Sequence, residues 1–509
     1  MSDVGDIRVL AGGRLAGRPP STDAVVIEGD RIHQVGRWAE LKGDVPAGAE
    51  VVDLAGATIL PGLGDAHVHM TATGFLETAL DGTDATEVGE ILMAVRAATR
   101  TTPPGEMVLG LRIEPDDLRE GRPPSLAELD AVAPDHPVYL RHVTGHASYA
   151  NSAALTFLDF HPGRNGVELD ETTGAPTGRL VGPATQDATH RAYAAYSRQV
   201  GYETALRAAA DRAARAGCTV LHALDDLDAV RTLLAIEDDL PIRTVAYPQT
   251  FDLDAVRALG LKRIGGCHAC ALDGDVDMRT AALLEPYEGH PTEYGELYHN
   301  DGTLKGFVLA AHHAGMQLAF HAVGDGAVEQ ALRMYEAAQA SESRPDARHR
   351  IEHAQLASDE QLLRARAAGA VLSLQPAFNM VWPHDTYATS FGRARAARVD
   401  PLASAARAGL PLAGGSDSTV TQLRPLVGVH AAVNHSRYEE RLDVPEALAL
   451  FSRGVAYAAH HDRHRGLVAP GFDADLTIVD RDPLEVAPSE LASLVVRMTV
   501  VRGQTVFEG

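Results

Sequence analysis

Cysteine is scarce in this chain, and its scarcity argues against a protein held together by disulfides. Only three cysteines, Cys218, Cys267 and Cys270, occur among 509 residues. A disulfide framework needs paired cysteines and an oxidising compartment. A sparse, odd set in a chain of this length instead fits a reducing environment, so we expect a cytoplasmic protein.

Basic residues are also few, and long apolar runs are missing. Lys and Arg number 45 against 69 Asp and Glu, giving a formal net charge of −24. This balance argues against nucleic acid and against an anionic membrane surface as partners. No run of about 18 apolar residues occurs, so no membrane span is expected, and the first six residues lack the basic and apolar pattern of a signal peptide.

Several catalytic motifs are absent as well. The sequence contains no Gly-x-Ser-x-Gly elbow, no P-loop and no Gly-x-Gly-x-x-Gly after a strand. Serine hydrolase, nucleotide-binding and dinucleotide-binding interpretations therefore lack support. With 45% hydrophobic and 22% charged residues, the chain is typical of a globular protein, long enough for two or three domains.

What the sequence does contain is a His-Val-His pair at the end of an apolar run, residues 59–70. Alternate side chains of a strand share one face, so His67 and His69 should point the same way, close enough to bind one ion. Two imidazoles suit zinc, iron, nickel or copper better than magnesium or calcium. A pair of polar residues on a wet edge strand is the alternative interpretation.

The middle of the chain alternates strand-like apolar runs with Ala- and Leu-rich helical runs, such as the helix expected over residues 205–217. This alternation predicts a parallel sheet with helices outside it, and its length favours a (β/α)₈ TIM barrel. In such a barrel the active site lies at the C-terminal ends of the strands. Six side chains are predicted at such ends and should line one mouth: His67, His69, His222, His321, His353 and Asp417.

Four of these residues, His67, His69, His321 and Asp417, would suffice to hold one divalent ion with a position left for water. Such an ion lowers the pKa of water and polarises a carbonyl. Asp417 could carry the water's proton to a leaving nitrogen. His353 is predicted as a further ligand or as a donor to the developing oxyanion, and the neighbouring acids Asp325 and Glu352 as groups that orient the histidines or as solvated loop acids.

The two ends of the chain are both rich in short strands. Residues 1–58 and the segments 474–480 and 495–507 read as β-strands separated by Gly, Asp and Pro. Chain termini often lie close together, so these ends could pair into one small β domain. Residues 71–200 are irregular, with Pro- and Gly-rich joints, and predict a lobe inserted after the first barrel strand.

The stretch Pro61-Gly62-x-x-Asp65-Ala66-His67-Val68-His69 resembles the first-strand motif of the amidohydrolase superfamily. The resemblance extends over nearly the whole chain and points to the amidohydrolase family 3 branch, which includes formamide deformylases. Further similar segments are Gly145-His146, Asn151–Leu155, Gly174–Gly178, Asp273-Gly274, Arg279–Leu283, His321–Asp325, His349–His353, Gln375-Pro376, Gly415–Asp417 and Gly466–Leu476.

This resemblance implies an α/β fold in which a (β/α)₈ TIM barrel carries a small β-sandwich domain built from both termini. The expected divisions are a sandwich from 1–60 and 466–509 and a catalytic barrel from 61–465, with the inserted lobe at roughly 75–200. It implies hydrolysis of a C–N bond in a small molecule, commonly an amide, formamide or cyclic amide. The family's metal ligands match His67, His69, His321, His353 and Asp417, and a homo-oligomer, expected as a dimer, is implied as well.

One departure from the family concerns a lysine that relatives often place before Asp-Gly, where it can be carboxylated to bridge two metals. Here residues 265–272 contain no lysine, and Lys262 lies too early. Either one metal is bound, or His268, Cys267 or Cys270 replaces the bridge. We expect one zinc ion, with two ions as the alternative and with iron or manganese left open.

Substrate contacts are predicted from the family-like segments that should face the mouth: His146, Arg141, Arg279, Gln375 and Trp382. An arginine could hold a substrate carboxylate or form a structural ion pair. Phe378 and Trp382 could form an apolar wall for an aryl group or simply anchor a loop. Other chemistry at the same metal site (decarboxylation, hydration or isomerisation) and a non-catalytic binding protein on this scaffold are the alternative functions.

Overall fold

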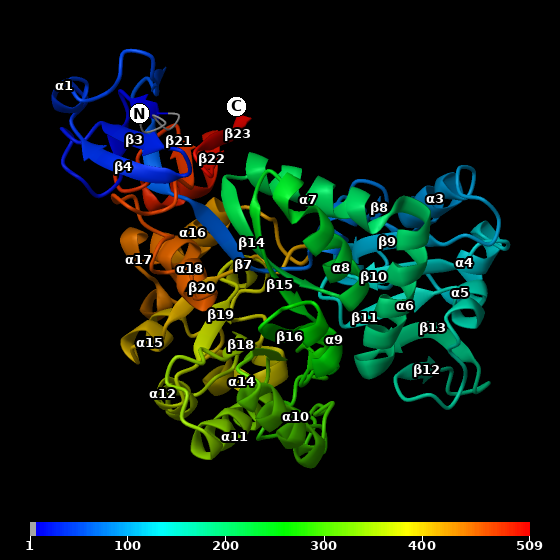
Figure 1. Cartoon of the computed structure of the whole chain (residues 1–509). Coiled ribbons are helices and arrows are strands. Elements are labelled where there is room, and N and C mark those ends of the chain that lie inside the picture. The colour runs from blue at the N-terminus through cyan, green and yellow to red at the C-terminus, as the bar shows by residue number, and fades with distance from the viewer. Residues whose placement is uncertain (1–6) are drawn as a thin grey trace.

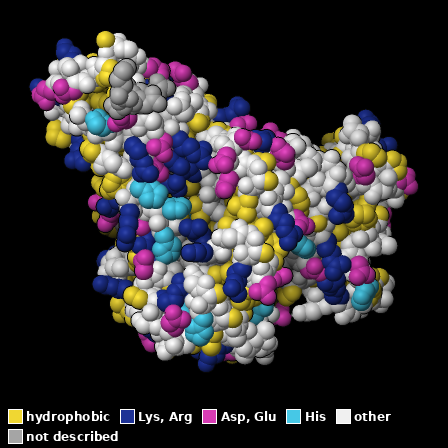
Figure 2. All heavy atoms as spheres, in the orientation of Figure 1, with side chains coloured by type: hydrophobic (Ala, Val, Ile, Leu, Met, Phe, Trp, Pro, Cys, Tyr) yellow, Lys and Arg dark blue, Asp and Glu magenta, His cyan; other side chains and the backbone are white. Residues whose placement is uncertain are grey.

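The structure, a computed structural model, describes residues 7–509. The expectation about a signal peptide concerns residues 1–6 and lies outside them. Among the described residues no helix is long and apolar enough to cross a bilayer. On the face drawn in Figure 2, basic side chains are interspersed with acidic ones and with histidines, which is the mixed surface of a typical globular protein.

Eight parallel strands occupy the centre of the molecule. They fall into a three-stranded sheet of order β15-β14-β7 and a five-stranded sheet of order β16-β17-β18-β19-β20, in which every neighbouring pair is parallel. A parallel bridge between Val68 and Ser418 joins the start and the end of this series. The strands are β7 Leu63–Val68, β14 Cys218–Asp225, β15 Arg243–Pro248, β16 Arg263–Ala271, β17 Gln317–Ala322, β18 Arg350–His353, β19 Val371–Leu374 and β20 Leu412–Gly414.

Helices connect and cover these strands, giving an α/β fold of the TIM-barrel type (Figure 1). The helix expected over residues 205–217 is α7, Tyr202–Arg215, and it is followed by Gly217, whose φ of 83° suits glycine. The other helices of this region are α2 Met70–Phe75, α8 Leu227–Ile236, α9 Leu253–Ala258, α10 Asp301–His313, α11 Asp325–Ser341, α12 Asp359–Ala367, α13 Phe378–Val381, α14 Ala388–Ala396, α15 Leu402–Arg407, α16 Pro425–Val433, α17 Val444–Ala449 and α18 Val455–Ala458.

Between β7 and β14 the chain builds a separate six-stranded sheet of order β12-β13-β11-β10-β9-β8. It carries its own apolar core, and the 19-residue helix α6, Gly182–Val200, leads back to α7. Its elements are β8 Leu80–Asp81, α3 Val88–Ala98, β9 Val108–Ile113, α4 Leu126–Val132, β10 Val138–His142, β11 Ala147–Ala150, α5 Ser152–Phe157, β12 Val167–Leu169 and β13 Pro176–Val181.

The two ends of the described chain meet in two further sheets, of order β4-β3-β1-β5 and β2-β6-β21-β22-β23. Strand β6 pairs antiparallel with β21, and one apolar cluster contains residues from both sheets. These elements are β1 Ile7–Ala11, β2 Arg14–Leu15, β3 Ala24–Glu28, β4 Arg31–Gly36, α1 Trp38–Leu41, β5 Glu50–Asp53, β6 Thr58–Pro61, β21 Leu476–Val479, β22 Val496–Val501 and β23 Gln504–Glu508. Because β6 continues directly into β7, this pairing fixes where the first central strand starts.

Candidate metal centre and active site

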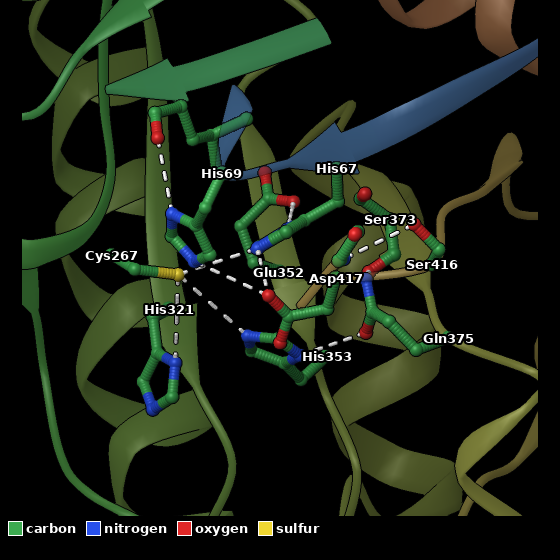
Figure 3. Close-up of polar contacts among 12 residues, drawn as sticks. His67, His69, Cys267, His321, Glu352, His353, Ser373, Gln375, Ser416 and Asp417 are labelled. Carbon is green, nitrogen blue, oxygen red and sulfur yellow. Dashed lines mark hydrogen bonds and ion pairs between the residues drawn. The ribbon is translucent and has the colours of Figure 1, made fainter. Parts of the chain in front are cut away.

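Five of the side chains predicted from the sequence meet at the C-terminal ends of the parallel strands (Figure 3). His67 lies on β7 and His69 just after it, His321 on β17, His353 at the end of β18 and Asp417 after β20. All five are buried. His353 and Asp417 have φ values of 68° and 52°, so the backbone leaves the strand direction where these side chains turn towards the centre.

Asp65 explains why the first strand and the loop after β20 hold their ligands together. Its buried carboxylate accepts the backbone N–H of His67 at 3.0 Å and the backbone N–H of Ser416 at 3.0 Å. Burial raises the pKa of this carboxyl to about 6, although those hydrogen bonds oppose the shift. Asp65 therefore ties His67 on β7 to Asp417, which lies one residue after Ser416.

The ring orientation of His67 and His69 is fixed from outside the site. Nδ1 of His67 donates to Oε2 of Glu352 at 2.7 Å, and Nδ1 of His69 donates to the carbonyl of Leu224 at 3.1 Å. In each ring the other nitrogen, Nε2, then carries a lone pair and points inwards. A hydrogen bond of this kind selects the ring tautomer that can bind a metal.

The rings of His321 and His353 are also oriented by hydrogen bonds from outside the site. Nε2 of His321 donates to the carbonyl of Gly274 at 3.1 Å, which leaves Nδ1 free. Nδ1 of His353 donates to Oε1 of Gln375 at 2.7 Å, which leaves Nε2 free. Gln375, predicted as a substrate contact, thus lies behind His353 and holds its ring.

Asp417 completes the set of inward-facing acceptors. Its Oδ1 lies 3.4 Å from Nε2 of His67 and 3.2 Å from Nε2 of His69, and among residues 7–509 this buried oxygen has no hydrogen-bond partner. Ligands at about 2.1 Å on a tetrahedral zinc are about 3.4 Å apart, so these separations suit a shared cation. The donor set therefore fits a divalent metal ion. Its residues form three overlapping groups of candidate ligands, two of which include Cys267.

Cys267 stands at the centre of the cluster, a position that the sequence offered only as one of three alternatives. Its Sγ lies 3.4 Å from Nε2 of His67, 3.8 Å from Nδ1 of His321 and 3.8 Å from Nε2 of His353 (Figure 3). Burial disfavours the thiolate, but positive charge on these imidazoles would hold the pKa of Cys267 well below its ordinary value.

His268, the predicted second-metal ligand, lies outside these three groups. Its ring stacks on His69 with centroids 5.1 Å apart, and its Nδ1 accepts from Gln249 at 3.2 Å. Cys270 also turns away, because its Sγ contacts the carbonyl of Thr250. The side-chain alternation of a regular strand does not predict which of Cys267, His268 and Cys270 faces the cluster, because the strand is irregular here.

Two further side chains support the site from below. Arg350 is fully buried and donates to both carboxylate oxygens of Glu352, at 2.7 and 2.8 Å. Burial alone would raise the pKa of Glu352, but Arg350 and His67 lower it to about 2. The prediction that His222 lines the mouth is wrong, because β14 continues to Asp225 and the His222 ring accepts a hydrogen bond from Arg350 among the central strands. Of the two acids predicted to orient histidines, Glu352 does so and Asp325 instead accepts the backbone N–H of Leu284.

A small cavity opens beside the metal-binding cluster, with about 40 Å³ of free volume. Its polar walls include His146, His321, His353 and Asp417, and its apolar walls are Val276, Val323, Phe378, Trp382, Tyr387 and Val420. Phe378 stacks parallel to His353, and Trp382 meets Phe378 edge to face. His146 and Trp382, both predicted as substrate contacts, therefore face this cavity.

The two predicted arginines do not line this cavity. Arg279 is half exposed and forms an ion pair with Glu293 at 2.9 Å. Arg141 is buried on β10 and packs against Gly145, so closely that a Cβ added at Gly145 would overlap its guanidinium.

Asp273 was not predicted as a site residue, yet its carboxylate lies 3.5 Å from Nε2 of His321 and accepts the backbone N–H groups of Val323 and Gly324.

Comparisons with known proteins show which family the chain resembles along its length. The model of a family described as "Amidohydrolase family" matches residues 50–507. YtcJ of Bacillus subtilis strain 168, an amidohydrolase by name, is 30% identical over 96% of both chains, and N-substituted formamide deformylase of Arthrobacter pascens is 26% identical over 96% of both. An uncharacterised metal-dependent hydrolase from Pyrococcus horikoshii superposes with a TM-score of 0.76 at 26% identity, covering 95% of this chain and 99% of that one. A triazine hydrolase variant shares the fold at 15% identity and a TM-score of 0.54, over 99% of this chain and 95% of the other.

Proposed function

Because the chain belongs to the amidohydrolase family, we propose that it is a metal-dependent hydrolase that cleaves a C–N bond of a small molecule. The proposed bond is an amide, formamide or cyclic amide bond. The observation that carries the proposal is the shared orientation of His67, His69, His321 and His353. Each donates its outer N–H to an acceptor and turns a lone pair towards the interior of the cluster, which is the arrangement of metal-binding histidines.

The proposed ligands are these four histidines together with Asp417. Nitrogen and oxygen donors with a nearby thiol favour zinc, with iron and manganese as alternatives. When bound there, a divalent ion would lower the pKa of water towards 7 and polarise a substrate carbonyl. The name of the formamide deformylase relative supports a carbonyl carbon joined to nitrogen as the group attacked.

Asp417 is the proposed carrier of the proton. It borders the cavity, and positive charge beside it, on His67 and His69 or on a bound ion, outweighs burial and holds its pKa well below the ordinary value of a carboxyl. It is therefore ionised at neutral pH and can accept a proton from the attacking water. The same carboxyl can then protonate the leaving nitrogen.

His353 is proposed as a ligand rather than as a proton donor. Its Nδ1–H is used in the bond to Gln375, and burial lowers its pKa. A neutral ring in this tautomer has a lone pair on Nε2 and no proton to give from that atom. This assignment chooses between the two roles that the sequence left open.

Apolar cavity walls support a substrate with an aryl or branched alkyl group. Phe378 and Trp382 meet at right angles on one side of His353, and Tyr387 lies in the same wall. Aromatic side chains with a few convergent polar groups are typical of small-molecule sites. We propose that this wall binds the nitrogen or acyl substituent of the substrate.

We also propose the domain division expected from the sequence. Pairing of β6 with β21 supports a β-sandwich from 1–60 and 466–509. The eight parallel strands support a (β/α)₈ barrel within 61–465, and the separate six-stranded sheet supports an inserted lobe at roughly 75–200.

The direct test is elemental analysis of unchelated protein, followed by a screen of formamides, N-acyl compounds and cyclic amides. We expect bound zinc, hydrolysis of at least one class, loss of activity on chelation and recovery with zinc. Protein that holds no divalent metal would contradict the proposal. Products that retain the C–N bond would instead favour decarboxylation, hydration or isomerisation at the same site.

A further inference from the structure

We propose that the Cys267 thiolate is a metal ligand shared between two neighbouring cation positions. This inference rests on the proposed metal-dependent function and deepens it. It assigns Cys267 to the bridging role that a lysine often has in relatives. It also replaces the expectation of one bound ion with two.

The first support is the spacing between Cys267 and the histidine nitrogens. Sγ lies 3.4 Å from His67 Nε2 and 3.8 Å from the facing nitrogens of His321 and His353. On a tetrahedral zinc, a Zn–S bond of about 2.3 Å and a Zn–N bond of about 2.0 Å place sulfur and nitrogen about 3.5 Å apart. The three observed separations bracket this value, so the sulfur is placed as a co-ligand with rings on both of its sides.

The second support is the division of the ligands into two groups that overlap at the sulfur. His67 and His69 form one candidate group with Cys267, and His321 and His353 form another with the same Cys267. A third group, made of His67, His353 and Asp417, takes one histidine from each side, so Asp417 lies between the two positions. Paired metal ions in hydrolases lie about 3.5–4 Å apart and need a ligand between them. A thiolate can fill that role because sulfur has several lone pairs available.

The two positions also differ in their access to the cavity. His321 and His353 line the cavity, whereas His67, His69 and Cys267 do not. The His321 and His353 position therefore has a side open to substrate, and the His67 and His69 position lies behind it. An open side is what a catalytic ion requires, and an enclosed one suits an ion that holds the ligands in place.

The backbone around Cys267 is built to turn this side chain inwards. Gly265 and Gly266 have φ values of 115° and 119°, which L side chains rarely adopt, and a Cβ on Gly265 would lie 2.0 Å from the carbonyl oxygen of Ala319. The pairing of β16 with β17 shifts register between Gly266 and Ala271. Such a bulge re-aims side chains beside active sites, and the backbone N–H of Cys267 is held by Gln249 Oε1 at 2.9 Å.

The other two cysteines show what a merely packed thiol looks like in this fold. Cys218 belongs to an apolar cluster on β14, and Cys270, three residues after Cys267, packs in the main core with its sulfur against a backbone carbonyl. Small buried thiols commonly pack in this way. Cys267 differs from both because three imidazole nitrogens face its sulfur.

Cobalt(II) titration of the metal-free full-length protein tests this assignment. We expect about two cobalt ions per chain and a thiolate-to-cobalt charge-transfer band in the near ultraviolet. Cys267→Ser should abolish the band and reduce the bound cobalt to about one ion or fewer. The matched control is Cys270→Ser on the same strand, which should keep both the band and the cobalt content.

The wild-type spectrum decides the question even if Cys267→Ser does not fold. Two bound ions without the band, or a band that survives in Cys267→Ser, would overturn the ligand assignment while leaving the proposed hydrolase intact. A single ion per chain would overturn the shared position. Wild-type protein that binds neither cobalt nor zinc would overturn both this inference and the proposed function.

Discussion

Nδ1 of His67 donates a 2.7 Å hydrogen bond to Oε2 of Glu352, and neither side chain is exposed to solvent. The two residues are 285 positions apart in the chain, and β7 and β18 bring them together from different parts of the central strand series. Arg350 compensates the buried charge of Glu352 through two further hydrogen bonds. The orientation of the first predicted metal ligand thus depends on a buried ion pair beneath it.

Glu352→Gln should weaken both metal binding and folding. The amide keeps the size of the side chain but leaves Arg350 without its counter-charge and His67 without its carboxylate acceptor. Loss of such a supporting group typically lowers metal affinity by about 10–100-fold, and breaking a buried ion pair costs about 3–5 kcal/mol. Zinc titration and urea unfolding measure the two effects. Glu360→Gln, at an exposed position of α12, is the control, and unchanged zinc affinity in Glu352→Gln would show that the ring of His67 needs no such support.

Asp417→Asn should lower the activity more than it lowers the stability of the fold. The amide cannot accept a proton, and general acid–base groups contribute about 10²–10⁴-fold to a rate. We expect kcat to fall by that factor, measured on protein whose metal content is determined in the same sample. Asp254→Asn, at a solvent-exposed position on α9, should leave kcat unchanged. Equal kcat in Asp417→Asn and wild type, at equal metal content, would remove Asp417 from the proton-transfer role.

Acid should destabilise the protein through His349, which lies at the opposite end of β18 from the metal ligands. Burial lowers its pKa to about 3, and its ring is held neutral because Nδ1 accepts the N–H of Leu318 while Nε2 donates to His312 Nδ1. The unfolded chain binds a proton near pH 6.5 and the folded chain does not. The stabilisation is therefore present above pH 6.5 and is lost as the pH falls towards 3.

His349→Asn tests this dependence, because asparagine cannot take up the proton. The difference in unfolding free energy between wild type and variant should narrow by about 1.4 kcal/mol per pH unit below 6.5. Urea unfolding at several pH values measures it. His161→Asn, at an exposed position, provides the control, whose difference from wild type should not show this slope. A constant difference for His349→Asn would mean that this ring titrates alike in both states.

Gly74→Ala should disrupt the contact between α2 and α7. A Cβ at Gly74 would lie 1.8 Å from the carbonyl oxygen of Ala205, so the two helices would have to separate. Overpacking against backbone costs about 3 kcal/mol or more, which thermal unfolding would detect. Gly306→Ala is the matched control, since Gly306 is also helical and has no atom within 4 Å of its Cβ position. That change should stabilise the protein by about 0.5–1 kcal/mol, and equal melting temperatures for the two variants would refute the close approach.

The sequence by itself determined the alternation of strands and helices and the positions of His67, His69, His321, His353 and Asp417. Apolar runs and helix ends are encoded by neighbouring residues, so local patterns predict the strands and helices. The ligands lie at strand ends, so the same patterns predict their positions. It also carried enough of the family pattern to point to a C–N bond hydrolase, and the family membership is confirmed.

Only the tertiary structure decided which of the two neighbours Cys267 and His268 faces the histidine cluster. Cys267 and His268 are adjacent, and the backbone bulge that selects between them arises where Gly265 passes against Ala319 on the next strand. The same holds for Glu352, whose partner is His67 rather than the adjacent His353, and for Arg279, which pairs with Glu293 away from the cavity. Such choices depend on contacts between residues far apart in the chain, and local sequence patterns do not encode them.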